Sequence, residues 1–317
     1  MLRFLMQRLL ALVPVLFTVA VIVFLILRLT PGDPAAVIAG NNATNEDIDR
    51  IREQLGLTQP LITQFLIWLG NVVQGDLGYS FYLNRPVTEL IAQRIEPTLS
   101  LATGTIVLAV LIAVPLGTLA AWRMGGWLDH LLSGFAVAGF SVPVFVIGYV
   151  LIYIFAIELQ WLPVQGYRRL FGSFSQGVGP WATQLVLPWC SLATIYVALI
   201  ARVTRASVSE ALTEDYIRTA RAKGLTERMV LLRHALANAA VPIVTVIGIG
   251  VALLIGGVVV TETVYAIPGL GSLTVDAVLN RDFPVIQGVV LFFSVLYVLI
   301  NLIVDLSYLW LDPRIRY

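Results

Sequence analysis

The stretch EDYIRTARAKGLTERMVLLRHAL, from Glu214 to Leu236, is charged, yet it lies between long apolar runs. The segment from Arg202 to Arg233 has 32 residues and 11 charges. A bilayer interior does not accept so many charges, because each one would lose its hydration there. The stretch therefore lies outside the membrane, and the rest of the chain decides which side it faces.

Helix start and stop signals divide this charged stretch. Thr213 is a good N-cap, and Glu214 and Asp215 follow in the first turn, where the helix dipole favours anions. Lys223 falls in the last turn, and Gly224 is placed for the left-handed residue that ends a helix. The spacing predicts a helix of about ten residues, which is too short to be stable in water without tertiary or partner contacts.

The composition identifies the chain as an integral membrane protein. Of its 317 residues, 58% are hydrophobic and 12% are charged, against about 25% charged residues in an ordinary soluble domain. The net charge of +1 provides no basic field for nucleic acid. Cys190 is the single cysteine, which excludes an intrachain disulfide and a cysteine metal cluster.

Six charge-free runs are long enough to cross a bilayer as helices, which takes about 20 mostly apolar residues. The predicted fold class is therefore all-α, with six transmembrane helices. The first run could be a signal peptide, but its apolar core is too long and no cleavage site follows at once, so a retained anchor is favoured. The runs are Leu9–Leu27, Pro97–Trp122, Leu131–Ile157, Trp181–Ala201, Ala235–Thr261 and Phe283–Val304, the last continuing toward Trp310.

The basic residues of the short loops predict the orientation, because cytoplasmic loops carry an excess of Lys and Arg. With the N-terminus inside, the opposite short loops hold only Arg168, Arg169 and Arg281. Both termini and the charged stretch are therefore expected in the cytoplasm. The cytoplasmic segments then hold Arg3, Arg8, Arg123, Arg202, Arg205, Arg218, Arg221, Lys223, Arg228, Arg233, Arg314 and Arg316.

The predicted organisation has three parts. Residues 1–30 form the N-terminal end and the first span, 31–96 an extracytoplasmic segment, and 97–317 the membrane core with a cytoplasmic loop at 202–233. The extracytoplasmic segment has its own helical signals. Asn45 can cap a helix that Gly56 ends, and the run after Pro60 has one apolar stripe. These short helices are interpreted equally as a structural cover or as a docking surface for an external partner.

The predicted short cytoplasmic helix carries Tyr216, Ala220 and Lys223 on one face, and Thr226 can cap a second helix after it. Three interpretations are open: a signal that only fixes topology, a contact with anionic lipid, and a helix presented to a cytoplasmic protein. The acidic residues of the stretch weaken attraction to anionic lipid. A topology signal alone would not need capping residues, so the third interpretation is favoured.

At these residues the sequence resembles the ABC importer permeases of the dipeptide, oligopeptide and nickel transport family, most closely their first permease. Each string alone is a weak signal, but together and in order they cover nearly the whole chain. They are DYIRTARAKG followed by RHALANAAVP, the N-terminal LTPGDP, GDLGYS at Gly75 to Ser80, TETVYAIPGLG at Thr261 to Gly271, RDFPVIQG at Arg281 to Gly288, and the tail NLIVDLSYLWLDPRIRY.

This resemblance implies a type I importer permease fold in which the short helix docks in a cleft of an ATPase subunit. It implies as partners a second homologous permease, two ATPase subunits and an extracytoplasmic solute-binding protein, besides membrane lipid. The chain has no phosphate-binding G-x-x-x-x-G-K-[ST] motif, so ATP and Mg are expected on the ATPases and no cofactor or catalytic residue on this chain. The implied ATPase-coupling residues are Asp215, Tyr216, Arg218, Thr219, Ala220, Arg221, Lys223 and Gly224.

Few ionisable groups lie within the apolar runs. Asp305 is the only carboxylate enclosed in the sixth run and is a possible intramembrane site, although its nearness to Asp312 favours structural pairing or hydration. His130 and His234 flank spans and are too far apart in sequence to suggest a metal site. Close helix packing, rather than bends at a pathway, is the favoured role of the following residues: Pro14, Pro115, Pro143, Pro188, Pro242, Gly248, Gly250, Gly256 and Gly257.

The predicted function is import of short peptides across a bacterial or archaeal cytoplasmic membrane. Within the same class the alternative cargo is a nickel chelate or glutathione. The alternative from another class is an ion-coupled secondary carrier, which should show ionisable groups near the midplane and often paired halves. Neither feature is clear in this sequence, and an intramembrane enzyme is more distant because paired catalytic groups are missing.

Overall fold

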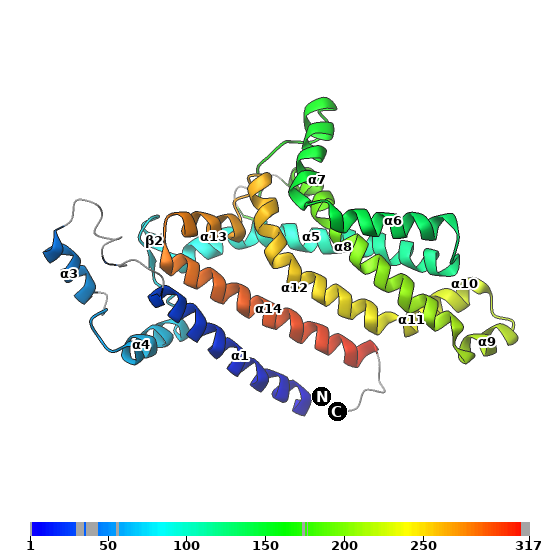
Figure 1. The fold of residues 1–317 in the computed structure, drawn as a ribbon, viewed down its shortest axis with the longest axis horizontal. Coiled ribbons are helices and arrows are strands. Elements are labelled where there is room, and N and C mark those ends of the chain that lie inside the picture. The colour runs from blue at the N-terminus through cyan, green and yellow to red at the C-terminus, as the bar shows by residue number, and fades with distance from the viewer. Residues whose placement is uncertain are drawn as a thin grey trace. The chain divides into compact units, whose positions relative to one another are not determined.

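The computed structural model describes residues 2–29, 35, 44–54, 57–172, 175 and 177–311, and within them the regular secondary structure is helical apart from one two-stranded hairpin. The chain divides into two compact units, each described by itself. The first unit comprises Met1–Ile95 and Ser272–Val298, and the second comprises Glu96–Gly271 and Leu299–Tyr317. Figure 1 shows the order of the elements along the chain.

The first unit contains the first helix and the predicted extracytoplasmic segment. Its elements are α1 (Leu2–Leu29), α3 (Asn45–Gln54), α4 (Leu61–Val73), and the strands β1 (Tyr79–Ser80) and β2 (Arg85–Pro86), which pair antiparallel. Edge-to-face contacts between Phe24 of α1 and Phe65 of α4, with centroids 5.3 Å apart, join these two helices. The two predicted short helices match α3 and α4, but Leu55, Gly56, residues 31–34 and residues 36–43 lie outside the described residues.

The second unit contains most of the membrane core. Its elements are α5 (Val87–Trp122, from Glu96 onward), α6 (Trp127–Ser141), α7 (Val144–Leu151), the π-helix η1 (Ile152–Glu158), α8 (Val178–Thr213), α9 (Asp215–Ala222), α10 (Glu227–Met229), the π-helix η2 (Val230–Ala235), α11 (Leu236–Asn238) and α12 (Ala240–Val264). Helix α13 (Leu270–Leu279) and helix α14 (Phe283–Leu311) are divided between the units. The start of α13, up to Gly271, and the end of α14, from Leu299, belong to the second unit. The tail after Leu311, including Asp312, lies outside the described residues.

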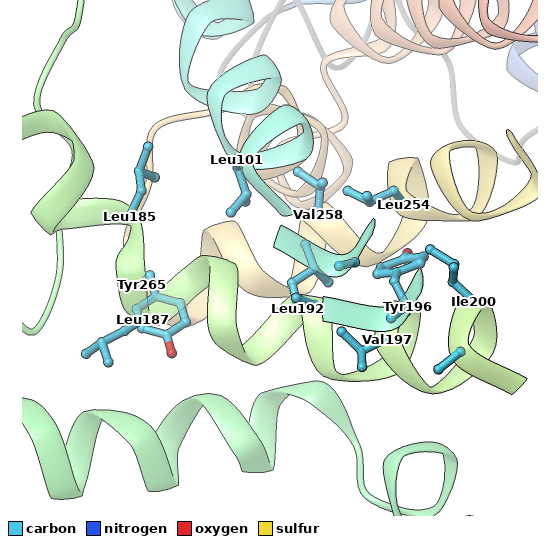
Figure 2. Packing of buried hydrophobic residues seen from close by; sticks show 14 of the residues in the cluster. Leu101, Leu185, Leu187, Leu192, Tyr196, Val197, Ile200, Leu254, Val258 and Tyr265 are labelled. Atoms are coloured by element: carbon cyan, nitrogen blue, oxygen red, sulfur yellow. The ribbon is translucent and has the colours of Figure 1, made fainter. Parts of the chain in front are cut away.

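The core of the second unit is built around α8, which packs on α6, α7 and α12. Figure 2 shows apolar side chains of α5, α8 and α12 pointing toward one another. Small residues permit the close approach, since a Cβ built on Gly117 of α5 would lie 2.6 Å from the carbonyl oxygen of Ala201. The labelled core residues are Leu101, Leu185, Leu187, Leu192, Tyr196, Val197, Ile200, Leu254, Val258 and Tyr265.

The membrane helices are less regular than six continuous runs. Among the described residues three helices are long and apolar enough to cross a membrane, or up to five if each bent pair counts as one span. The predicted third span is wrong as one helix, because α6 and α7 meet at a 102° bend where Val142 and Pro143 are extended and Pro143 is the N-cap of α7. The predicted fifth span is bent by 58° before α12, and α1 contributes a shorter apolar stretch, Leu10–Ile26.

Candidate functional site

The charged stretch folds into a short helix, α9, at the end of α8. Glu214 is extended, with φ −70° and ψ 149°, and it ends α8 and begins α9. The expectation that Thr213 caps α9 is wrong, because Thr213 is still helical and its Oγ1 donates to the carbonyl oxygen of Glu210 at 2.7 Å. No side-chain hydrogen bond caps the start of α9 in the structure.

The end of α9 has the geometry predicted from its glycine. Gly224 has φ +79°, a left-handed conformation that residues with a Cβ rarely adopt. Its N–H donates to the carbonyl oxygen of Arg221 at 2.9 Å, and the N–H of Leu225 donates to that of Ala220 at 3.3 Å. These two bonds form a Schellman motif, which satisfies the last carbonyl groups of the helix. The predicted helix stop is confirmed.

The inner face of α9 is apolar. Ile217 is fully buried and Ala220 is 6% exposed, and both belong to a core cluster formed with α5, α8, η2 and α12. Ala220 is therefore turned into the protein, and its place on a partner contact stays a prediction. Ile217 was missed, although a lone large apolar residue in a charged helix was the signal for an anchor. The other cluster members are Ala121, Val208, Ala211, Val230, Leu231, Ala235, Ala239 and Ile243.

The outer face of α9 is charged and open. Asp215 and Arg218 are exposed and 3.4 Å apart, a surface pair that contributes little stability. Thr219 and Lys223 are also exposed. Arg221 makes two hydrogen bonds to Glu227 of α10, from Nε at 2.9 Å and from Nη2 at 3.2 Å, so it fixes the following turn. The predicted residues other than Ala220 are thus brought together on one accessible surface.

Tyr216 lies at the border of this surface and is 38% exposed. Partial burial raises the pKa of its hydroxyl, with a smaller contribution from the charge of Glu214, and a hydrogen bond with Asn238 opposes the rise. The hydroxyl is therefore neutral at physiological pH. A neutral aromatic side chain that is partly open suits a contact with a second protein.

A partly buried ion pair supports the same end of α8. The guanidinium of Arg205 on α8 binds both carboxylate oxygens of Asp129 on α6, with Nη2 to Oδ2 at 2.8 Å. The N–H of Gly125 also donates to Oδ2 of Asp129, at 2.9 Å. Asp129 is 5% exposed, so the pair fixes the α5–α6 turn against α8. Sequence reasoning missed Asp129, because an acidic residue beside a basic turn gives no sign of its distant partner.

Asp305 does not belong to this surface. It is half-buried on α14, whereas α9 packs on α8 and η2. Nearby on α14, the hydroxyl of Tyr308 bonds to Thr245 of α12 at 2.9 Å. Among the described residues no group of three or more His, Cys, Asp or Glu side chains could hold a metal ion.

The chain thus has a helical core with candidate membrane spans, and a short charged helix, α9, is exposed at the end of α8. Residues 113–317 match the family described as "Binding-protein-dependent transport system inner membrane component", and residues 1–102 match its N-terminal model. The chain belongs to this family. It is a permease subunit of an ABC importer, a multi-pass inner-membrane component of transport rather than an enzyme.

Two relatives cover nearly all of the chain. It is 54% identical over 314 residues, 99% of each chain, to the "Probable peptide ABC transporter permease protein y4tP" of Sinorhizobium fredii (strain NBRC 101917 / NGR234). It is 45% identical over 317 residues, 100% of each chain, to the "Glutathione transport system permease protein GsiC" of Escherichia coli (strain K12).

Solved structures share the fold of the membrane core. An inward-facing MetNI methionine ABC transporter matches with a TM-score of 0.58 at 19% identity, covering 70% of this chain and 96% of that one. An amino acid ABC transporter solved with histidines matches with a TM-score of 0.51 at 16% identity, covering 69% and 93%. The likeness confirms the predicted type I importer fold for this part of the chain.

Proposed function

We propose that this permease imports short peptides, driven by ATP hydrolysis on separate ATPase subunits. The single observation that carries the cargo is the 54% identity, over 99% of the chain, to a relative named as a peptide permease. Glutathione is the second candidate, because the relative that is 45% identical over its full length is named for it. Glutathione is itself a small peptide, so both candidates are peptides that differ in identity rather than in chemical class.

The outer face of α9 is the proposed contact with an ATPase subunit. Asp215, Arg218, Thr219 and Lys223 supply charged and polar contacts, and Tyr216 supplies an aromatic anchor of the kind that dominates many interfaces. Arg221 and Gly224 act on the shape of α9, through the pair with Glu227 and through the left-handed helix end. ATP and Mg bind to the ATPases, and this chain supplies no group to them.

Movement of the ATPase would reach the membrane helices through the inner face of α9. Ile217 packs in one cluster with Ala121 of α5, Val208 of α8 and Ile243 of α12. Since protein interiors are close-packed, a displaced α9 pushes on all three helices instead of sliding over them. The ion pair of Asp129 with Arg205 extends this connection to α6.

The proposed topology has six spans, with α1, α5, the α6–α7 pair, α8, the bent helix ending in α12, and α14 each crossing once. Both termini and α9 then face the cytoplasm of a bacterium or archaeon, in keeping with the excess of Lys and Arg on that side. Residues 31–96 form an extracytoplasmic segment that a solute-binding protein can approach. A second permease subunit completes the pathway.

A gene deletion tests the cargo. A strain that lacks this permease and cannot make one amino acid should fail to grow when di- or oligopeptides are its only source of that amino acid. Uptake of the free amino acid should be unchanged, which controls for general damage to the membrane.

Other results of the deletion experiment separate an error in the cargo assignment from an error in the transport role. If the strain uses di- and oligopeptides normally but no longer takes up glutathione, glutathione replaces them as the cargo. If it instead loses nickel-dependent enzyme activity, the peptide assignment is overturned. Uptake of all these compounds at the parental rate would overturn the transport role proposed for this gene.

A further inference from the structure

Glu262 is a carboxylate in the last turn of α12 that the proposed ATPase contact does not explain. Its side chain is fully buried, whereas acidic residues are almost never fully buried unless a specific arrangement holds them. The hydroxyl of Thr98 on α5 donates to Oε1 of Glu262 at 2.6 Å. The same hydroxyl accepts the N–H of Leu270, the first residue of α13, at 2.8 Å. Thr98 therefore connects three segments that are distant in sequence.

Two glycines pack directly against this carboxylate. A Cβ built on Gly269 would lie 2.0 Å from Oε1 and 2.5 Å from Oε2 of Glu262. A Cβ built on Gly271 would lie 2.9 Å from Oε2 and 2.7 Å from the Cα of Val259. Real Cβ atoms do not come so close to other atoms, so the backbone of the α12–α13 connection rests directly on the carboxylate.

The connection between α12 and α13 is itself held tightly. The carbonyl oxygen of Glu262 accepts the N–H of Ile267 at 2.8 Å, and Ala266 between them has φ +48°. A left-handed alanine costs free energy and persists only where its surroundings impose it. The carbonyl oxygen of Tyr265 also accepts the N–H of Gly166 at 2.8 Å. These contacts thus fix the segment from Tyr265 to Gly271 to the end of α12.

The helices joined by Thr98 and Glu262 are also joined at their opposite ends. Ala121 of α5 and Ile243 of α12 pack with Ile217 of α9 in one cluster. At about 1.5 Å per helical residue, Thr98 lies roughly 35 Å along α5 from Ala121, and Glu262 lies roughly 28 Å along α12 from Ile243. The two helices therefore connect the cluster around α9 to the carboxylate of Glu262 at their far ends.

We propose that Glu262 and Thr98 are positioning residues for transport, which make the α12–α13 connection follow the movement that α9 imposes on α5 and α12. This inference rests on the proposed role of α9 as the ATPase contact. The two residues touch neither ATP nor the ATPases. Their loss separates ATP hydrolysis from movement of cargo.

The test uses the complete importer in proteoliposomes, with cargo uptake and ATP hydrolysis measured on the same preparation. Thr98→Val keeps the shape of the side chain but removes the hydroxyl, and it should lower uptake per ATP hydrolysed by about tenfold or more, because it removes two buried hydrogen bonds. Thr98→Ser keeps the hydroxyl and should restore the ratio to within about twofold of the parent. The ATPase subunits should copurify with both variants in the parental amount.

Alanine substitutions at two glycines provide a matched test and control. Gly269→Ala should reproduce the effect of Thr98→Val, because the added methyl group meets the carboxylate. Gly256→Ala on α12 should behave as the parent, since no described atom lies within 4 Å of a Cβ built there. If Thr98→Val does not assemble, Glu262→Gln, which has the same shape as the carboxylate, replaces it in the assay.

Three results would overturn the inference: parental uptake per ATP in Thr98→Val, an equal loss in Thr98→Val and Thr98→Ser, or a proportional loss of uptake and hydrolysis. The last of these would show a structural role only. Failure of the proposed α9 contact is a separate result, because it would show as ATPase subunits that do not crosslink to α9 in the parental importer.

Discussion

Replacing Gly224 tests the geometry of α9 with little interference from packing. Gly224 has φ +79°, and no described atom lies within 4 Å of a Cβ built on it. A new Cβ therefore meets no described atom of this chain, and the cost of alanine there comes from the backbone conformation. The series Gly224→Asn, Gly224→Ala and Gly224→Val varies this cost at one position, because Asn tolerates the left-handed conformation and a β-branched residue tolerates it least.

The size of the expected effect follows from the φ angle of Gly224. The left-handed conformation costs an L-residue such as Ala about 1–2 kcal/mol. If α9 keeps its Schellman end, Gly224→Ala should raise the population in which the helix end is open by about 5- to 30-fold. Gly224→Asn should raise it less, and Gly224→Val more.

Hydrogen exchange of the assembled importer measures this population. The relevant N–H groups are those of Gly224 and Leu225, which bond to Arg221 and Ala220 in the folded helix end. Their exchange should accelerate in the order Asn, Ala, Val, while the amides of α12 exchange as in the parent. Gly134→Ala on α6 is the control, because a Cβ built there also meets no described atom within 4 Å and its φ is not left-handed.

Function should follow the same order. Gly224→Val should assemble in the membrane but show less cargo uptake per ATP hydrolysed, since α9 is misplaced. Equal exchange in all three variants, or faster exchange in Gly224→Asn than in Gly224→Val, would refute the reasoning from the backbone angle.

Two further predictions concern the packing that holds α9. Ile217→Ala should destabilise α9 by about 2–5 kcal/mol, because it empties a fully buried site, and it should reduce copurification of the ATPases. The control Arg218→Ala removes an exposed side chain, so its free energy of unfolding should stay within about 0.5 kcal/mol of the parent. An equal effect of both on thermal unfolding would contradict the anchoring role of Ile217. Asp129→Asn should destabilise the second unit by about 1–3 kcal/mol, and a thermal double-mutant cycle with Arg205→Gln should show strong coupling, whereas additive effects would argue against the ion pair.

The sequence predicted the end of α9 well and its orientation poorly. A glycine after a helix needs only local backbone chemistry to end it, so Gly224 was recognisable. Which side of a short helix faces inward depends on the segments that pack on it. Ile217 and Ala220 are buried by α8 and η2. Ile217 is the one large aliphatic residue of α9, but nothing in the sequence of α9 identifies the segments that cover it. Thr213 has the side chain of a cap, but α8 continues through it.

The bends of the membrane helices show a similar limit. The charge-free run Leu131–Ile157 looks continuous in the sequence, yet it is broken at Pro143. Other prolines, such as Pro115 and Pro188, lie inside continuous helices. A proline in the sequence therefore indicates that a bend is possible, but it does not show which proline bends the helix. Glu262 was part of a recognised motif, but its burial against Thr98 appears only in three dimensions.

The most direct test of the account is a crosslink from the outer face of α9 in the assembled importer. Cys190 is the single cysteine, so Cys190→Ser gives a background for one new thiol at a time. Arg218→Cys on α9 should crosslink to an ATPase subunit, and the yield should change when ATP is added. Ile62→Cys on α4, which is also exposed, should give no crosslink to an ATPase. Failure of Arg218→Cys to reach an ATPase in any nucleotide state, or equal crosslinking from Ile62→Cys, would contradict the proposed coupling role of α9.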